Sequence, residues 1–246
     1  QACSEFEQVA TLMTYTKTKD GDTELVPTIC NESTAKRIIE SRAFIAALPP
    51  IHVVSRCPVL VERDRGLEAI TGYDRDSGIL AAGCPPPDMD ILEARELLFD
   101  MIAEFSFATS ADRSRYLANL ITPALVMGQL GGFRAPIQYN EADKSQSGKG
   151  YLNKLTAAVY NEVPAIVNQQ KGGGVGSMRE KFDSWLIHGS VFISFDNLTP
   201  CRDGVFNSEE LCSFMTEHLY MARALRTKMV IEPKYHVIMA TTNGCT

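Results

Sequence analysis

Residues 143–150 read Asp-Lys-Ser-Gln-Ser-Gly-Lys-Gly, a short polar loop that ends in a Gly-Lys pair. The pattern G-x-x-x-x-G-K-[ST] binds nucleotide phosphates: loop amides and a helix N-terminus hold the oxygens, the lysine reaches the terminal phosphates, and the hydroxyl binds magnesium. Gly148 and Lys149 fit this pattern, whereas Asp143 replaces its first glycine and Gly150 replaces its Ser or Thr. The stretch is therefore either a degenerate phosphate loop or an ordinary loop that carries a lysine.

The segments around the loop favour the first interpretation. Residues 135–139 predict a short strand before it, and apolar residues at helical spacing follow it, namely Leu152, Leu155 and Val159. Residues 190–196 predict an apolar strand that ends in Asp196, and residues 235–243 predict a strand that ends in Asn243. Strands ending in lysine, aspartate and asparagine follow the order of an additional-strand P-loop ATPase.

The block from about Pro85 to Asn243 resembles the AAA+ and superfamily-three-like ATPases of phages, plasmids and other mobile elements, often the helicase part of primase-helicase proteins. The resemblance rests on the order and spacing of Ser-Gly-Lys-Gly-Tyr-Leu at 147–152, Phe-Asp-Asn-Leu at 195–198, residues 211–216, Arg-Ala-Leu at 223–225 and Ala-Thr-Thr-Asn at 240–243. It implies an α/β fold, a P-loop NTPase parallel sheet of the additional-strand type flanked by helices. It also implies the cofactors ATP and Mg²⁺ and a homo-oligomeric ring.

The resemblance assigns roles to individual residues. The nucleotide-binding candidates are Ser145, Gln146, Ser147, Gly148, Lys149, Gly150 and Tyr151, and the metal-binding candidate is Asp196. Asn197 stands where the family usually has a glutamate that polarises the attacking water, and Asn243 suits a sensor of the terminal phosphate. An amide orients water but cannot take its proton, so slow turnover is expected from these two catalytic candidates. Arg223 and Arg226 are the candidates for an arginine finger.

A basic stretch near the C-terminus leaves two interpretations open. Arg223, Arg226, Lys228 and Lys234 face only one acidic residue, Glu232, and residues 232–236 are predicted to form a hairpin turn. In the ring ATPases that the chain resembles, this region can face a neighbouring subunit or a central channel. There we expect single-stranded or duplex DNA to contact Arg226, Lys228, Lys234 and His236. The alternative is a solvated edge.

Two classes of function follow. The first is a helicase or replication-associated ATPase motor that acts on DNA. The second is a nucleotide-binding scaffold or switch with little or no hydrolysis. The departures at Asp143, Gly150 and Asn197 favour the second class, whereas the resemblance and the basic stretch favour the first, so the sequence leaves open whether the protein is an enzyme.

Composition excludes several other classes. The chain has 246 residues, 45% of them hydrophobic and 22% charged, without a run long enough to span a bilayer and without a recognisable signal peptide. Its seven cysteines lack zinc-site spacing and indicate free thiols in the cytoplasm. A net charge of -6 argues against a generally basic surface. Gln1 is not an initiator residue, so we expect a fragment that is truncated after the last strand.

The expected organisation is an N-terminal α+β module, residues 1–84, and an ATPase core, residues 85–246, divided at the proline run of residues 84–87. The module is expected to contain a hairpin that turns at Asp20-Gly21 and a helix from Asn31 to Pro49. In the core, helices are expected over 91–105, from Ser110, over 177–185 and over 207–216, with Trp185 buried. The glycine-rich residues 169–176 are either a mobile linker or a second phosphate cradle.

Overall fold

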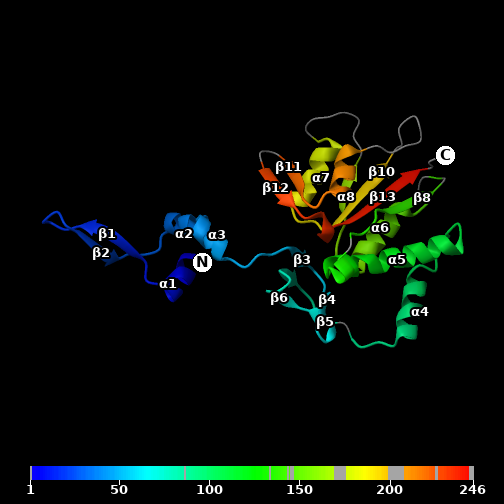
Figure 1. Cartoon of the computed structure of the whole chain (residues 1–246), viewed down its shortest axis with the longest axis horizontal. Helices are drawn as coiled ribbons and strands as arrows, with labels where there is room; N and C mark the ends of the chain where they lie inside the picture. Colours follow the sequence, from blue (N-terminus) through cyan, green and yellow to red (C-terminus); the bar gives the residue numbers. More distant parts are fainter. Residues whose placement is uncertain are drawn as a thin grey trace. The chain divides into compact units, whose positions relative to one another are not determined.

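A computed structural model describes residues 2–85, 87–132, 134–142, 144, 147–168, 176–198, 208–224 and 227–243. The chain divides into two compact units, residues 1–50 and residues 51–246. Figure 1 labels most of their helices and strands.

The unit of residues 1–50 combines one antiparallel hairpin with short helices: α1 (Ala2–Val9), β1 (Met13–Lys17), β2 (Thr23–Pro27), α2 (Glu32–Ile39) and α3 (Arg42–Ala47). The hairpin predicted around Asp20-Gly21 is confirmed by the pairing of β1 with β2. The single helix predicted from Asn31 to Pro49 is wrong. Asn31 caps α2, and the hydroxyl of Ser41 accepts a hydrogen bond from the amide of Phe44 and starts α3.

This first unit has a sparse core. Within its described residues only Cys30 and Ala35 are buried, and Val9 and Ile29 are 81% and 80% exposed. The apolar pattern of residues 31–49 predicts one buried face that includes Ile39 and Ile45, but these residues are 42% and 57% exposed. A unit of this size with so few buried side chains gains little stability from apolar burial.

The second unit begins with small strands: β3 (Val53–Ser55), β4 (Val59–Arg63), β5 (Gly66–Ile70), β6 (Gly72–Asp74) and β7 (Ile79–Ala81). Their buried residues share a cluster with Val126 and Met127 and with residues of the main sheet. Gly128 makes this contact close, because a Cβ there would lie 1.7 Å from the carbonyl oxygen of Leu60. The compact units therefore divide after Pro50, whereas the proline run predicts a border at Cys84.

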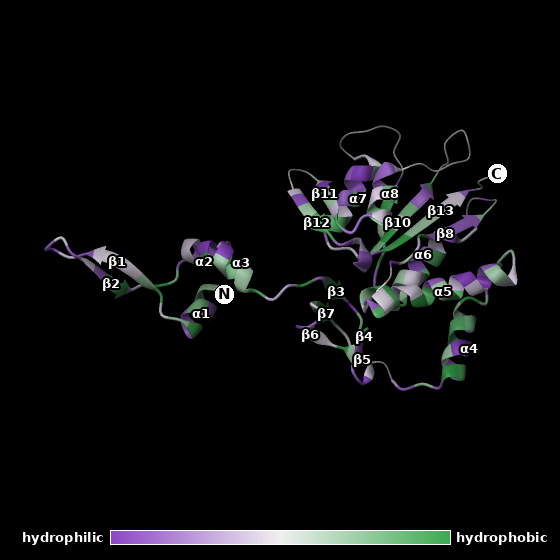
Figure 2. Cartoon of the chain, in the orientation of Figure 1, coloured by the Kyte–Doolittle hydropathy of each residue, from purple (hydrophilic) through white to green (hydrophobic). Residues whose placement is uncertain are grey.

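Two helices precede the main sheet: α4 (Ile91–Met101) and α5 (Ser110–Met127), which continues into a short 3-10 turn, η1 (Leu130–Gly132). Thr109 and Asp112 form a capping box that starts α5 where the sequence predicts it. The apolar residues of 91–105 recur on one helical face, which predicts packing on the sheet, but none of the α4 residues is buried, and Ile91 and Leu97 are 80% and 52% exposed. The ribbon of α4 is mostly green in Figure 2, which shows that most of its residues are hydrophobic.

The main sheet has four parallel strands in the order β8-β13-β10-β9. Its strands are β8 (Gln138–Ala142), β9 (Ala165–Asn168), β10 (Phe192–Leu198) and β13 (Val237–Asn243). The connecting elements are α6 (Lys149–Ala158), α7 (Met178–Ile187), α8 (Glu209–Thr216), the antiparallel pair β11 (Tyr220–Ala224) and β12 (Thr227–Ile231), and the 3-10 turn η2 (Pro233–Tyr235). The strand predicted over 135–139 begins three residues later than expected.

Side chains of alternate strand residues fill two cores, one on each face of the sheet. Phe192 and Met239 pack with Ala157 of α6 on one face. Ile193 and Ala240 join the cluster of α7 and α8 on the other face, so helices flank both sides (Figure 1). The chain is thus a mixed α/β protein with a parallel sheet flanked by helices. Trp185 is not in the core, since it is 36% exposed and its indole N–H donates to Ile166.

Buried polar contacts fix α6 against the sheet. Asn153, 1% exposed, accepts a hydrogen bond from the side-chain amide of Asn140 in β8 across 2.6 Å. It also donates to the hydroxyl of Ser194 in β10 across 2.8 Å. The hydroxyl of Tyr116 in α5 donates to the carbonyl of Leu152 across 2.9 Å. Because α6 is held from three elements, the position of its N-terminus relative to the strand ends is fixed.

Candidate functional site

The N-terminus of α6 lies beside the carboxyl ends of the parallel strands. Gly148 precedes the helix with φ 88°, a left-handed conformation that glycine adopts without steric cost. Lys149 is the first helical residue. The free backbone N–H groups and the dipole of α6 therefore face the same edge of the sheet as the ends of β10 and β13.

The ammonium group of Lys149 is buried among neutral oxygen atoms. The residue is 8% exposed, and its Nζ donates to the Asn243 Oδ1 at 2.6 Å, the Lys144 carbonyl at 3.0 Å and the Ser147 hydroxyl at 3.2 Å. Within the described ranges, no carboxylate forms an ion pair with it. A buried cation usually has an anionic partner, so this arrangement favours an anion at the site.

Asn243 connects Lys149 to the next strand. While its Oδ1 accepts from Lys149, its Nδ2 donates to the Oδ1 of Asn197 at 3.0 Å. Both polar ends of the Asn243 amide are therefore engaged. The catalytic candidates Asn197 and Asn243 are in direct contact, as their places at the ends of β10 and β13 require.

A bulge near the end of β10 places both Asp196 and Asn197 beside the hydroxyl of Thr241. The register between β10 and β13 shifts between Phe195 and Leu198, and Asn197 has φ 51°. The buried hydroxyl of Thr241 donates to Asp196 Oδ1 at 3.0 Å and accepts from the backbone N–H of Asn197 at 2.9 Å. Thr241 thus orients the metal-binding candidate and the residue after it.

These side chains enclose a cavity of about 460 Å³. Its lining residues are Ser147, Gly148, Lys149, Gly150, Tyr151, Lys154, Asp196, Asn197, Thr241 and Asn243. Eight of these are site candidates from the sequence. Ser145 and Gln146, and Asp143 of the same loop, lie outside the described residues. Asp196 is the one acidic residue that lines the cavity in the described part of the chain.

The DNA-binding candidates lie elsewhere. Lys228 in β12 is exposed and pairs directly with Arg223 in β11, whereas Arg226 lies outside the described residues. The turn predicted over 232–236 is wrong: the hairpin is formed by β11 and β12, and residues 233–235 form η2. Proline at 233 starts this 3-10 turn, which leads directly into β13.

Two candidates from this region make structural contacts. The ammonium of Lys234 pairs with Glu232 at 3.0 Å, and this hydrogen bond raises the pKa of Lys234. The ring Nδ1 of His236 hydrogen bonds with the carbonyl of Ser190 at 3.0 Å, so Nδ1 carries the proton. Burial lowers the pKa of His236 to about 4, and its ring is therefore neutral near pH 7.

Sequence reasoning missed two residues that line the cavity. Thr241 lies two residues before Asn243 on the same strand, and the period of two places both on one face. Lys154 lies three residues after Tyr151, a spacing that puts both on one side of a helix. These periodicities were available in the sequence, but only the sheet and helix contacts show that both faces meet the cavity.

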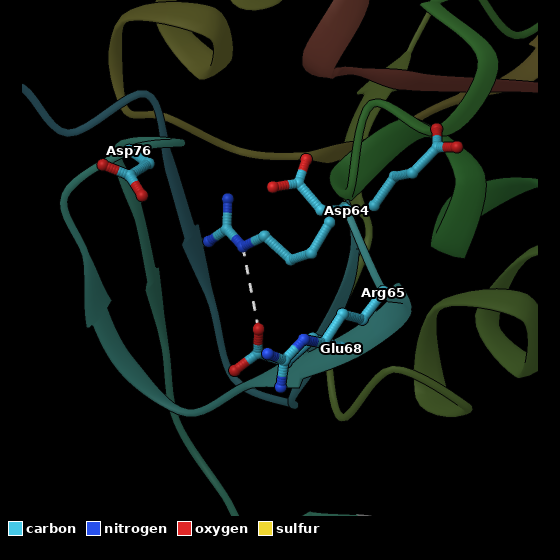
Figure 3. A pocket seen from close by; sticks show the side chains of 6 residues that line it. Asp64, Arg65, Glu68 and Asp76 are labelled. Atoms are coloured by element: carbon cyan, nitrogen blue, oxygen red, sulfur yellow. Dashed lines mark ion pairs between the residues drawn. The ribbon is translucent and has the colours of Figure 1, made fainter.

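A larger hollow, of about 940 Å³, lies at the hairpin of β4 and β5 (Figure 3). It is lined by charges of both signs: Glu62, Arg63, Asp64, Arg65, Glu68 and Asp76. Arg63 is engaged by Asp74 at 2.6 Å and by Glu68 at 3.7 Å. The residues that line this hollow are exposed, apart from the half-buried Arg63, whose charge is already paired. The cavity at α6 instead contains the buried ammonium of Lys149, so it is the better candidate site.

Metal clusters and membrane-spanning helices were also considered. In the described part of the chain, three or more His, Cys, Asp or Glu side chains are nowhere gathered to hold a metal ion. Every helix in these ranges is too short or too polar to cross a lipid bilayer. A comparison with protein-family models found no match for this sequence, and a search of curated proteins found none either.

Proposed function

We propose that the unit of residues 51–246 binds a nucleoside triphosphate, with the phosphates on Lys149 and the N-terminus of α6. The observation that carries this proposal is the buried ammonium of Lys149, which has only neutral partners among the described residues. Phosphate oxygens would supply the missing negative charge. The helix N-terminus favours the same ligand through its free N–H groups and its dipole.

The cavity suits this ligand in size. Its volume of about 460 Å³ falls within the range of roughly 300–1,000 Å³ that small-molecule sites occupy. The strand order gives further support, because β13 with Asn243 lies between β8, which precedes the loop, and β10, which carries Asp196. This is the arrangement expected for an additional-strand P-loop ATPase, and ATP is the triphosphate that the resemblance favours.

Asp196 could serve as a ligand of a magnesium ion that is also bound by the triphosphate. Magnesium is often held by one or two carboxylates, with phosphate oxygens and water completing its six ligands, so a dedicated cluster of protein ligands is not required. Asp196 would supply the carboxylate, and Gly150 supplies no hydroxyl. The bound ion would neutralise part of the triphosphate charge.

Among the two classes of function, the geometry favours a nucleotide-binding switch with slow hydrolysis. Asn197 cannot take a proton from water, and its amide oxygen is occupied by Asn243. Asp196 is the one carboxylate that lines the cavity in the described ranges, and Thr241 donates a hydrogen bond to it. In this proposal Asp196 binds magnesium, so the described lining offers no second carboxylate as a base. A DNA-dependent motor remains the second proposal, because Arg223 and Lys228 present two neighbouring cations on β11 and β12.

Calorimetric titration of the full chain with MgATP tests the binding proposal. Lys149→Ala removes the ammonium charge and at least one charged hydrogen bond to the phosphates, so we expect the affinity for MgATP to fall by about 10- to 100-fold. Lys36→Ala is the matched control, since Lys36 has a 71% exposed side chain in the other unit. Unchanged affinity in a Lys149→Ala protein with the parent's circular dichroism spectrum would refute the proposal. Hydrolysis measured with and without single-stranded DNA separates the switch from the motor.

A further inference from the structure

Beside the phosphate end of the cavity lies an exposed aromatic side chain. Tyr151 is 64% exposed although it lines the cavity, two residues after Lys149 in the first turn of α6. An exposed aromatic ring in a cavity wall presents a flat apolar surface without a partner on its outer side. As a lining residue, Tyr151 contributes such a surface to the cavity.

A second ring supports Tyr151. The ring of Phe105 lies 6.1 Å from that of Tyr151, with an angle of 32° between the planes. Phe105 also approaches the N-cap of α6, since its Cε1 lies 3.5 Å from the position that a Cβ of Gly148 would take. Phe105 packs against the cluster formed by Ile102, Tyr116 and Leu120. The supporting ring is therefore anchored in the core, and it limits the positions that the Tyr151 ring can take.

We infer that Tyr151, supported by Phe105, is the stacking surface for the base of the nucleotide. This inference rests on the proposed function, because Lys149 marks where the phosphates would lie. A nucleotide has a charged end and a flat aromatic end, and the cavity offers a matching pair: the ammonium of Lys149 and the ring of Tyr151. The larger π-face of a purine gains more from such a surface than that of a pyrimidine, so the expected ligand class is a purine nucleoside triphosphate.

Lys154 supports the same assignment. It lines the cavity and lies one helical turn beyond Tyr151, on the side away from Lys149. Among the described residues it takes part in no ion pair or side-chain hydrogen bond. Its ammonium is thus available to the sugar or to a ring nitrogen of a base that stacks on Tyr151, whereas the phosphates have Lys149.

The test compares a ligand that has a base with one that lacks it. We would titrate the full chain with MgATP and with magnesium triphosphate, for the parent, Tyr151→Ala and Tyr151→Phe. Stacking on an aromatic side chain is worth about 5- to 150-fold in affinity per base. We therefore expect Tyr151→Ala to weaken ATP binding by at least fivefold and to leave triphosphate binding unchanged. Tyr151→Phe keeps the ring and should bind both ligands as the parent does.

Tyr15→Ala is the matched control, because Tyr15 is 75% exposed in the other unit. Equal losses for ATP and triphosphate in Tyr151→Ala would place this residue at the phosphates and overturn the inference. Unchanged ATP affinity would overturn it as well, while Lys149→Ala would still report on the phosphate site. If the parent binds neither ligand, the proposed function fails, and the stacking surface fails with it.

Discussion

The Nζ of Lys149 donates a hydrogen bond to the Oδ1 of Asn243 across 2.6 Å, so the first residue of α6 is tied to the last residue of β13. This contact joins two positions 94 residues apart in the chain. The contact does not neutralise the ammonium charge, because the side-chain amide of Asn243 is uncharged. The positive charge of Lys149 therefore stays available to an incoming anion.

The variant Asn243→Asp tests this point. It places a carboxylate where the amide oxygen now accepts from Lys149, which neutralises the ammonium and repels phosphate. We expect the affinity for MgATP to fall about tenfold or more while thermal stability is kept or raised. Calorimetric titration and a melting curve measure both. Asn243→Ala is the control, since it removes the contact without adding charge and should lose less affinity. Tighter binding by the aspartate variant would contradict a phosphate site at Lys149.

Gly150→Thr restores the hydroxyl that a full phosphate loop has. Among the described residues, a Cβ at Gly150 would meet no heavy atom within 4 Å outside its local chain, so the position has space for a Cβ. We expect half-maximal ATP binding at a lower magnesium concentration, because the hydroxyl adds a ligand. Gly150→Val has the same shape without the hydroxyl and should titrate like the parent. If the threonine and valine variants need the same magnesium concentration, the missing hydroxyl does not limit metal binding.

The DNA proposal predicts a salt effect at the hairpin of β11 and β12. Arg223 and Lys228 are exposed and directly opposite each other, so both would contact phosphates of one strand. Replacing both by alanine should weaken DNA binding and flatten its log–log salt dependence by roughly 0.7 to 0.9 units per lost contact. Lys234→Ala is the control, since Lys234 pairs with Glu232. Equal slopes for the parent and the double variant on single-stranded and duplex DNA would leave the hairpin a solvated edge.

His236 predicts loss of stability in acid. Burial lowers the pKa of its ring from 6.5 to about 4, so the unfolded chain takes up a proton at a higher pH than the folded one. The free energy of unfolding is then largest above pH 6.5 and falls as the pH drops toward 4, by at most about 1.4 kcal/mol per pH unit. His236→Asn keeps a donor for the Ser190 carbonyl without the titration. Denaturant unfolding of both proteins from pH 7.5 to pH 4 should show the steeper decline in the parent; parallel declines would exclude His236 as the cause.

Local patterns predicted much of the sheet unit and little of the first unit. The strands that carry Asp196 and Asn243 and the helix after Gly148 follow from apolar periodicity and from a glycine at a helix start, although β10 continues two residues beyond Asp196, to Leu198. The side chains that meet at the strand ends could be named because parallel strands end at one edge. The sequence pattern could not predict that Ile91 and Ile45 are exposed. A helical apolar stripe is buried only where another element covers it, and the pattern does not show which element that is. Likewise, only the pairing of β11 with β12 locates the turn of the basic hairpin.

The left-handed backbone at Asn197 has a consequence for protein engineering. A simple route to faster hydrolysis would be Asn197→Glu, which supplies a carboxylate that can take a proton from water. Asparagine adopts φ near 51° readily, whereas most other side chains do so at a cost of roughly 1–2 kcal/mol. A glutamate would therefore strain the bulge that holds Asp196 and break the amide contact with Asn243, and a lower melting temperature would report it. Residue 197 is constrained by the backbone conformation of the bulge as well as by its side-chain chemistry, so the bulge and the side chain would have to be redesigned together.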